Sequence, residues 1–251
     1  MKKFEFLLVA TTILASIFVS PSIILADDTG ANYSSEGVIE FEPGTQITDP
    51  VDPVDPENPI VPVDPTDPEK PIKPGTQGPL SIDFASNLDF GKQKITSKDE
   101  IYFAKPQQYK ATEPVDAPIV EGPNFVQVSD NRGTESGWTL KVSQDGQFTS
   151  TTGKTLTGAK VTFKNGNIMT ASESPVPSTS SDTFVLDPDG LESEVMAAKA
   201  GEGAGTYLMD WGTDADSAAQ SIELAIPGAT TKYAEQYTTS FNWILTDTPA
   251  N

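Results

Sequence analysis

The chain has 251 residues, 36 acidic against 16 basic side chains, a formal net charge of -20, and neither cysteine nor histidine. Such an acidic chain argues against nucleic acid as a partner, and the missing residue types exclude disulfides, thiolate chemistry and histidine general bases. The length suffices for one well-cored domain with appended segments.

Residues 1–26 have the three parts of a secretory signal peptide. Lys2 and Lys3 precede an apolar run from Phe6 to Val19, and the small residue Ala26 precedes two aspartates. An uncleaved transmembrane anchor is the alternative, because apolar residues continue to Leu25. Pro21 interrupts the run and favours cleavage after Ala26.

The rest of the chain is expected to leave the cell and to have no membrane span in its mature form. No later segment is apolar enough to cross a bilayer, and the last residues contain no recognisable sorting signal. Export without cysteine fits a Gram-positive bacterium, where disulfides are scarce. We therefore expect a secreted protein that stays at the cell wall or cell surface by non-covalent binding.

Residues 27–48 form an N-terminal segment with one expected short strand. In residues 37–44, Val38 and Glu40 alternate with Ile39 and Phe41 before the pattern stops at a Pro-Gly pair. A lone strand is unstable, so we expect it to add to the edge of another sheet, in this molecule or in a partner. A disordered tail is the alternative.

Residues 49–78 are rich in proline and aspartate. Nine prolines recur at every third position from Pro50 to Pro74. A polyproline II helix has three residues per turn, so this spacing predicts an extended, semi-rigid spacer with the prolines along one edge. A proline-rich ligand for a recognition module is the second interpretation.

Residues 79–251 have the composition of a folded domain. Short runs of alternating polar and apolar residues occur at 80–84, 125–128, 138–142, 159–163, 222–226 and 241–245. Period two over four to six residues predicts antiparallel strands with one buried face. Only Leu191 to Lys199 has a helical pattern. The predicted fold class is all-β: an antiparallel β-sandwich-like domain with at most one or two short helices, preceded by the spacer.

Two of these runs contain a Trp-x-Leu tripeptide. Trp138 and Leu140 form one pair, and Trp243 and Leu245 form the other. Positions i and i+2 of a strand share a face, so each Trp points the same way as its Leu. Such a pair suits a sandwich core, and it also suits a ligand-binding platform. Both interpretations stay open.

The tripeptides and their surroundings resemble the WxL family of Gram-positive wall-associated proteins. The resemblance rests on the Asp-Pro-Val-Asp-Pro spacer and on the segments 78–84, 87–91, 130–133, 137–140, 156–159 and 237–249. It implies non-covalent binding to the cell wall, with peptidoglycan as ligand, and complexes with membrane-anchored and sortase-anchored companion proteins. It also implies that Trp138, Leu140, Trp243 and Leu245 matter for attachment. Tyr207 departs from the pattern, since a tryptophan is expected there.

Three further features of the sequence resemble binding sites. Arg132, the only arginine, suits either an ion pair with Asp130 or recognition of a carboxylate on a stem peptide. The glycines at 201, 203 and 205 favour close backbone packing over a phosphate loop, because no strand-then-helix unit surrounds them. The acidic clusters at 187–192 and 210–216 do not have the spacing of a calcium loop.

The sequence thus predicts a wall-binding surface protein without catalytic residues, metal or cofactor. Carboxylate pairs can serve glycosidases, but no serine or threonine has a lysine base in a helical context. The alternative function is a protein–protein interaction module that assembles with membrane-anchored and sortase-anchored companions, with wall contact secondary.

Overall fold

The computed structural model describes residues 32–250 and separates the chain into two units, residues 1–40 and 41–251. The predicted signal peptide lies outside the described residues. Residues 32–40 have no regular secondary structure and are exposed. The strand expected at 37–44 does not form within the described part of the chain, where only Gly44 of this segment makes a hydrogen bond. Its pairing with a partner stays a prediction.

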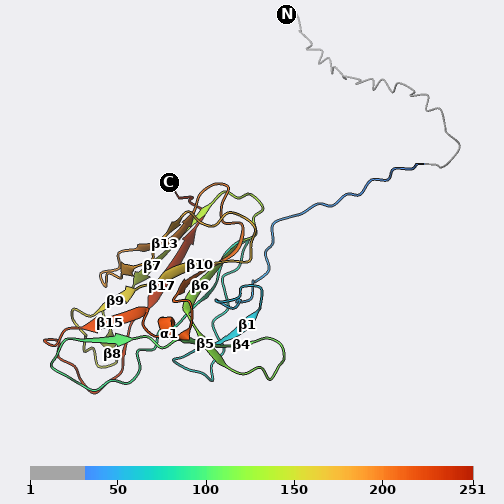
Figure 1. Cartoon of the computed structure of the whole chain (residues 1–251). Coiled ribbons are helices and arrows are strands. Elements are labelled where there is room, and N and C mark those ends of the chain that lie inside the picture. Colours follow the sequence, from blue (N-terminus) through green and yellow to red (C-terminus); the bar gives the residue numbers. More distant parts are fainter. Residues whose placement is uncertain (1–31, 251) are drawn as a thin grey trace, which may run out of the picture. The chain divides into compact units, whose positions relative to one another are not determined.

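The second unit consists almost entirely of antiparallel strands (Figure 1). They are β1 (Ile60–Val63), β2 (Leu80–Ala85), β3 (Glu100–Phe103), β4 (Gln107–Ala111), β5 (Val120–Gly122), β6 (Asn124–Asp130), β7 (Trp138–Gln144), β8 (Thr149–Ser150), β9 (Lys160–Phe163), β10 (Gly166–Met169), β11 (Thr179–Ser180), β12 (Phe184–Val185), β13 (Ser193–Ala198), β14 (Gly205–Trp211), β15 (Ile222–Ile226), β16 (Tyr237–Thr238) and β17 (Phe241–Thr246). The short helix α1 (Ala215–Ala218) lies between β14 and β15. The predicted all-β, antiparallel fold class is confirmed.

The strands form several sheets, and one of them is central. Its strand order is β10-β14-β6-β2, and a second sheet has the order β11-β13-β7-β17. A third has the order β12-β9-β15-β3, a three-stranded sheet has β1-β4-β5, and β16 pairs with β8. All seven residues of β6 are buried, which shows that both faces of the central sheet are covered.

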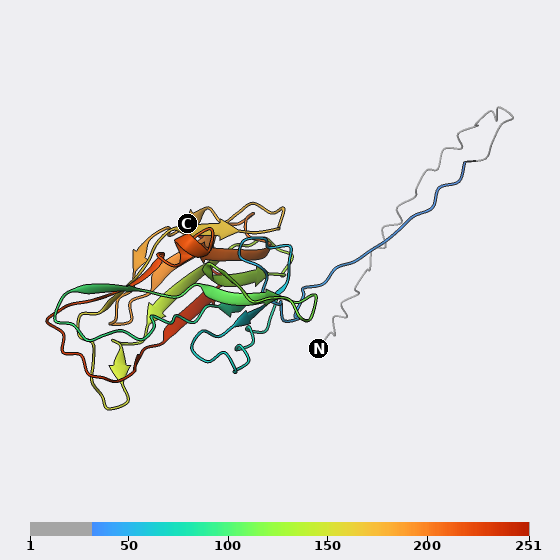
Figure 2. The ribbon, with the colours of Figure 1, turned by 60° about the horizontal axis from the view of Figure 1, so that its bottom comes forward.

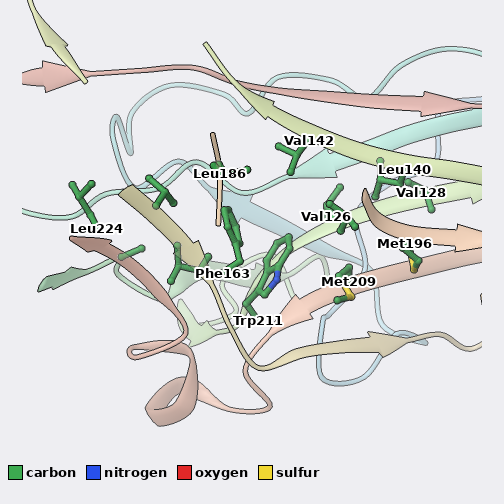
Figure 3. Packing of buried hydrophobic residues seen from close by; sticks show 14 of the residues in the cluster. Val126, Val128, Leu140, Val142, Phe163, Leu186, Met196, Met209, Trp211 and Leu224 are labelled. Atoms are coloured by element: carbon green, nitrogen blue, oxygen red, sulfur yellow. The ribbon is translucent and has the colours of Figure 1, made fainter. Parts of the chain in front are cut away.

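The main hydrophobic core lies on one face of the central sheet. Figure 3 shows Trp211 and Met209 of β14 and Val126 of β6 packed among Phe163, Leu140 and other apolar side chains of the neighbouring sheets. The opposite face has a smaller core, which contains Phe125 and Leu208 of the central sheet together with Phe84, Ile60 and Tyr109. The central sheet is therefore the middle layer of a three-layer arrangement.

The proline-rich segment is the largest difference from the expected organisation. Val51 forms a bridge with Pro59, and β1 pairs antiparallel with β4, from Ile60 opposite Ala111 to Val63 opposite Gln108. Pro50, Pro53 and Ile60 are buried. Residues 50–63 are thus a hairpin and a strand of the second unit instead of an extended spacer. The domain boundaries expected from the sequence, with a spacer over residues 49–78 and a domain from residue 79, stay predictions.

The helix expected at Leu191–Lys199 is wrong, because the chain forms β13 there. This strand lies between β11 and β7, and Val195 through Ala198 are all buried. A strand buried on both faces loses the polar–apolar alternation that identifies a strand in sequence. The neighbouring strands, which sequence periodicity does not reveal, decided the conformation.

Candidate functional site

The two Trp-x-Leu tripeptides lie side by side in one sheet. β7 and β17 pair antiparallel, with Leu140 directly opposite Leu245 and Trp243 opposite Val142. Residues directly opposite one another in an antiparallel pair have Cβ atoms roughly 5 Å apart. The tripeptides, more than 100 residues apart in sequence, therefore form one continuous apolar patch on the inner face of the sheet.

The first tripeptide is entirely inside the protein. The side chains of Trp138 and Leu140 are 0% exposed. The indole Nε1 of Trp138 donates a hydrogen bond to the carbonyl oxygen of Gly203 at 2.9 Å, and its ring lies 6.3 Å from that of Tyr207. Neither motif side chain reaches a surface on which a polymer could bind.

The glycine-rich loop before β14 packs closely against the indole ring of Trp138. Gly203 has a φ of +77°, and a Cβ at this position would lie 2.7 Å from the indole nitrogen. Only glycine tolerates both the backbone conformation and the close approach. The prediction that this loop serves close backbone packing is therefore confirmed.

The second tripeptide is nearer the edge of the core. Trp243 and Leu245 are partly buried and pack against the main cluster. The ring of Trp243 lies 5.9 Å from that of Trp211, which contacts Phe163 edge-on at 4.6 Å. The two motif tryptophans thus have different aromatic partners. Of the two interpretations of the tripeptides, the structure supports core packing.

Arg132 forms a bidentate ion pair within its own turn. Its Nε and Nη2 atoms donate to the two carboxylate oxygens of Asp130 at 2.9 and 2.7 Å, and Nη2 also donates to the carbonyl oxygen of Gly137 at 2.8 Å. The hydrogen bonds to Asp130 hold the pKa of the guanidinium above its usual value. The predicted ion pair is confirmed, and it fixes the chain just before β7.

We expect Arg132→Ala to lower the free energy of unfolding by about 1.5–3 kcal/mol, the usual cost of losing hydrogen bonds to a charged group. The Asp130 side chain is only 1% exposed, so its carboxylate would stay buried without a partner. Urea unfolding followed by circular dichroism measures the change. Lys141→Ala, which breaks the exposed pair with Glu192, is the control and should cost less than about 1 kcal/mol. Equal losses in the two variants would contradict the assignment.

Two buried carboxyl groups lie beneath the proline-rich hairpin. Asp83 occupies a bulge in β2 and accepts hydrogen bonds from Ser81, Gln127 and Ser129, while burial raises its pKa. Asp210 of β14 is 1% exposed, and its Oδ1 has no hydrogen-bond partner within residues 32–250. Burial, and secondarily the charge of Asp52, raises the pKa of Asp210 to about 9.

The hairpin is held over these groups by its backbone. The side-chain amide of Gln127 accepts from the Val51 N–H at 2.8 Å and donates to the Asp49 carbonyl at 3.1 Å. The Tyr109 hydroxyl donates to Asp52 at 3.0 Å. These contacts were not predicted, since no sequence signal relates the Asp-Pro repeat to the central sheet.

Comparison with known families decides what the chain is. Residues 28–249 match the family model described as "WxL domain surface cell wall-binding". The chain belongs to the WxL family. No curated protein and no solved structure matches it.

Family membership makes this protein a cell-wall-binding surface protein. WxL is a family of wall-binding domains and not a family of enzymes. The matched range begins before the first strand of the second unit and includes the proline-rich residues 49–78. Within residues 32–250 no helix is long and apolar enough to cross a membrane.

One surface of this WxL domain combines an exposed aromatic ring with hydroxyl groups. An open depression is lined by Lys154, Tyr233 and the threonines Thr155, Thr157, Thr230 and Thr231. Tyr233 is 43% exposed, and the Lys154 ammonium lies 5.0 Å from the centre of its ring. The depression offers an apolar ring, several hydroxyls and one positive charge to a ligand.

The acidic clusters do not assemble into a metal site in the described part of the chain. No group of three or more acidic side chains among residues 32–250 is close enough to hold a metal ion. Asp214 caps α1, where its side chain accepts from the Ser217 N–H at 2.8 Å. Asp187 accepts a hydrogen bond from the Asp189 N–H at 2.8 Å within a turn. Both clusters therefore have local structural roles.

Proposed function

We propose that this WxL protein is secreted from a Gram-positive cell and binds peptidoglycan non-covalently, without catalysis. The observation that carries the proposal is the match of residues 28–249 to a family of surface cell wall-binding domains. A signal peptide in residues 1–26 supplies the route of export. The strongly negative chain repels anionic wall polymers at long range, so attachment depends on short-range contacts.

The depression around Tyr233 is the surface that best suits a wall glycan. A tyrosine presents an apolar ring for the C–H face of a sugar, together with a polar hydroxyl. Threonine hydroxyls donate and accept hydrogen bonds with sugar hydroxyls and amides. Lys154 adds a positive charge that suits the carboxylates of stem peptides. The motif tryptophans contribute to attachment by building the fold that holds this surface.

Sedimentation with purified peptidoglycan tests the function. Protein secreted from the full-length coding sequence is mixed with sacculi from which proteins and anionic polymers have been stripped. We expect saturable pelleting. Pelleting only after addition of a companion surface protein would overturn the proposal and favour the protein–protein interaction module.

Substitution of Tyr233 tests the surface. We expect Tyr233→Ala to weaken pelleting at least tenfold, because exposed tyrosines at the centre of a binding site often contribute about 1.4 kcal/mol or more. The fold should persist, since the side chain is largely outside the core. Tyr33→Ala, at a tyrosine that is 95% exposed, is the matched control and should bind normally. Equal binding by both variants would place the site elsewhere.

A further inference from the structure

An exposed segment without regular secondary structure precedes β3, and its backbone groups have no hydrogen-bond partner in the described chain. Residues Lys92–Thr96 have no regular secondary structure, and no backbone N–H or C=O of these five residues takes part in a hydrogen bond within the described chain. Ile95 is 58% exposed. An exposed segment with free backbone groups and an apolar side chain can pair with a strand of another molecule.

The N-terminal segment has the complementary features. Residues Val38–Glu42 also form no hydrogen bonds within the described chain, and Val38, Ile39 and Phe41 are 95%, 77% and 85% exposed. Residues 32–42 contain three glutamates and no basic residue. Residues 92–98 contain three lysines and no acidic residue. In a chain of net charge -20, this basic stretch is unusual.

We propose that Val38–Glu42 of one molecule pairs antiparallel with Lys92–Thr96 of a second copy. In the register that places Glu40 opposite Lys94, Glu42 lies opposite Lys92. The same register places Ile39 opposite Ile95 on the other face. Opposite charges and apolar pairs that face each other across two strands each stabilise the pairing by about 0.2–1 kcal/mol.

The antiparallel direction follows from the proline in the donor segment. A parallel arrangement also brings both glutamates near lysines, but it places Ile95 opposite Pro43. Proline has no N–H to donate, so the parallel ladder would lose a hydrogen bond at that position. The antiparallel register uses only residues before Pro43.

The partner must be another molecule, because Glu42 cannot reach Lys92 of its own chain. The Gly44 N–H donates to the Asn131 carbonyl at 3.0 Å, just beyond the end of β6. The two residues from Gly44 back to Glu42 span at most about 7 Å.

The acceptor segment lies beyond the other end of β6. The side chain of Asn124, at the start of β6, donates to the Lys105 carbonyl, and the Lys105 N–H donates to the Asp89 carbonyl. The seven residues of β6 cover roughly 20 Å. From Gly91 the chain continues away to Ser97, which lies against Gly228 after β15. In Figure 2 this teal loop lies at one end of the second unit.

The consequence is head-to-tail assembly. The donor and acceptor surfaces differ, so the contact is heterologous and does not close on itself after two copies. Five residue pairs make a small interface, well below the size of a stable dimer. We expect weak self-association that becomes effective where the molecules are concentrated, as on a wall.

Disulfide trapping tests the pairing. Because the chain has no native cysteine, only the introduced cysteines can form disulfides. Protein secreted from the full-length coding sequence with Ile39→Cys is mixed with an Ile95→Cys variant under mild oxidation. The control mixture replaces the acceptor with Val176→Cys, at a valine of similar exposure, 53%. We expect the first mixture to give the heterodimer at least fivefold faster on non-reducing gels, which corresponds to about 1 kcal/mol.

Charge reversal tests the register. Lys94→Glu in the Ile95→Cys chain should slow trapping several-fold, because it faces Glu40. Glu40→Lys in the Ile39→Cys chain should then restore the rate. Equal trapping rates with the Ile95→Cys and the Val176→Cys acceptors would overturn the pairing. A trapping rate that neither charge reversal changes would overturn the register. Peptidoglycan sedimentation is independent of these residues, so its outcome does not bear on this proposal.

Discussion

Replacing Trp138 with alanine is expected to lower the free energy of unfolding by about 3–5 kcal/mol, the cost of emptying a buried tryptophan site. The side chain is fully buried, its indole contacts Tyr207, and its Nε1 is hydrogen bonded to Gly203. Because many domains are stable by only 5–15 kcal/mol, wall binding should decline together with the folded fraction. Urea unfolding and peptidoglycan pelleting of the same samples measure both quantities.

Two variants separate the packing of Trp138 from its hydrogen bond. Trp138→Phe keeps an aromatic ring but leaves the Gly203 carbonyl without its partner, which should cost about 1–3 kcal/mol in addition to the lost packing. Trp243→Ala should cost less than Trp138→Ala, because Trp243 is only partly buried. A Trp138→Ala protein that unfolds like the wild type but no longer pellets would contradict the structural role and indicate direct ligand contact.

Replacing Asp210 with asparagine is expected to flatten the dependence of stability on pH. Burial and the charge of Asp52 raise the pKa of Asp210 in the folded protein to about 9, against an ordinary value of 3.8. Between these values the folded protein holds a proton that the unfolded chain releases. The stabilising contribution is therefore full below pH 3.8 and declines as pH rises toward 9, by up to about 1.4 kcal/mol per pH unit.

Asparagine has nearly the shape of a protonated aspartate and stays neutral at every pH. We expect Asp210→Asn to raise the melting temperature more at pH 8 than at pH 5, measured by differential scanning calorimetry. Asp116→Asn, at an exposed acid, is the control and should leave the wild-type pH profile unchanged. The assignment of a buried, neutral carboxyl group to Asp210 would be contradicted if the melting temperature of the wild type rose from pH 5 to pH 8 and the variant showed the same rise.

The position of Asp210 also links stability to the proline-rich hairpin. Asp52 belongs to this hairpin, and its negative charge contributes to the raised pKa of Asp210. The hydrogen bond from Tyr109 holds Asp52 in place. The acidic hairpin thus lies over a buried acid. Two negative charges in this position would repel each other, and the neutral form of Asp210 avoids this repulsion.

Sequence periodicity was sufficient for strands that have one polar face. The runs at 80–84, 138–142, 222–226 and 241–245 correspond to β2, β7, β15 and β17. Their residues alternate between polar and apolar types, and this alternation marks them as strands even where the polar residues are also buried, as in β7. In β13 the buried residues Val195 to Ala198 are all apolar, so no alternation marks the strand and the helical pattern was misleading.

The motif residues identified the family but not a ligand-binding surface. Trp138, Leu140, Trp243 and Leu245 were recognisable as motif residues from the segments that surround them, whereas their adjacency depends on the pairing of β7 with β17. The Tyr233 depression joins residues 153–157 with residues 227–233. No local pattern marks either segment, because an exposed tyrosine and scattered threonines are ordinary loop composition.

The sequence by itself determined the charge, the absence of disulfides, the all-β class and membership of the WxL family, because these depend on composition, period-two patterns and ordered motifs. The tertiary structure alone decided that the first tripeptide is fully buried, that Gly203 receives its indole, and that the hairpin at 50–63 covers Asp210. Those outcomes depend on contacts between segments far apart in the chain. Local propensity carries no information about such contacts, since burial is a property of the neighbours that surround a residue.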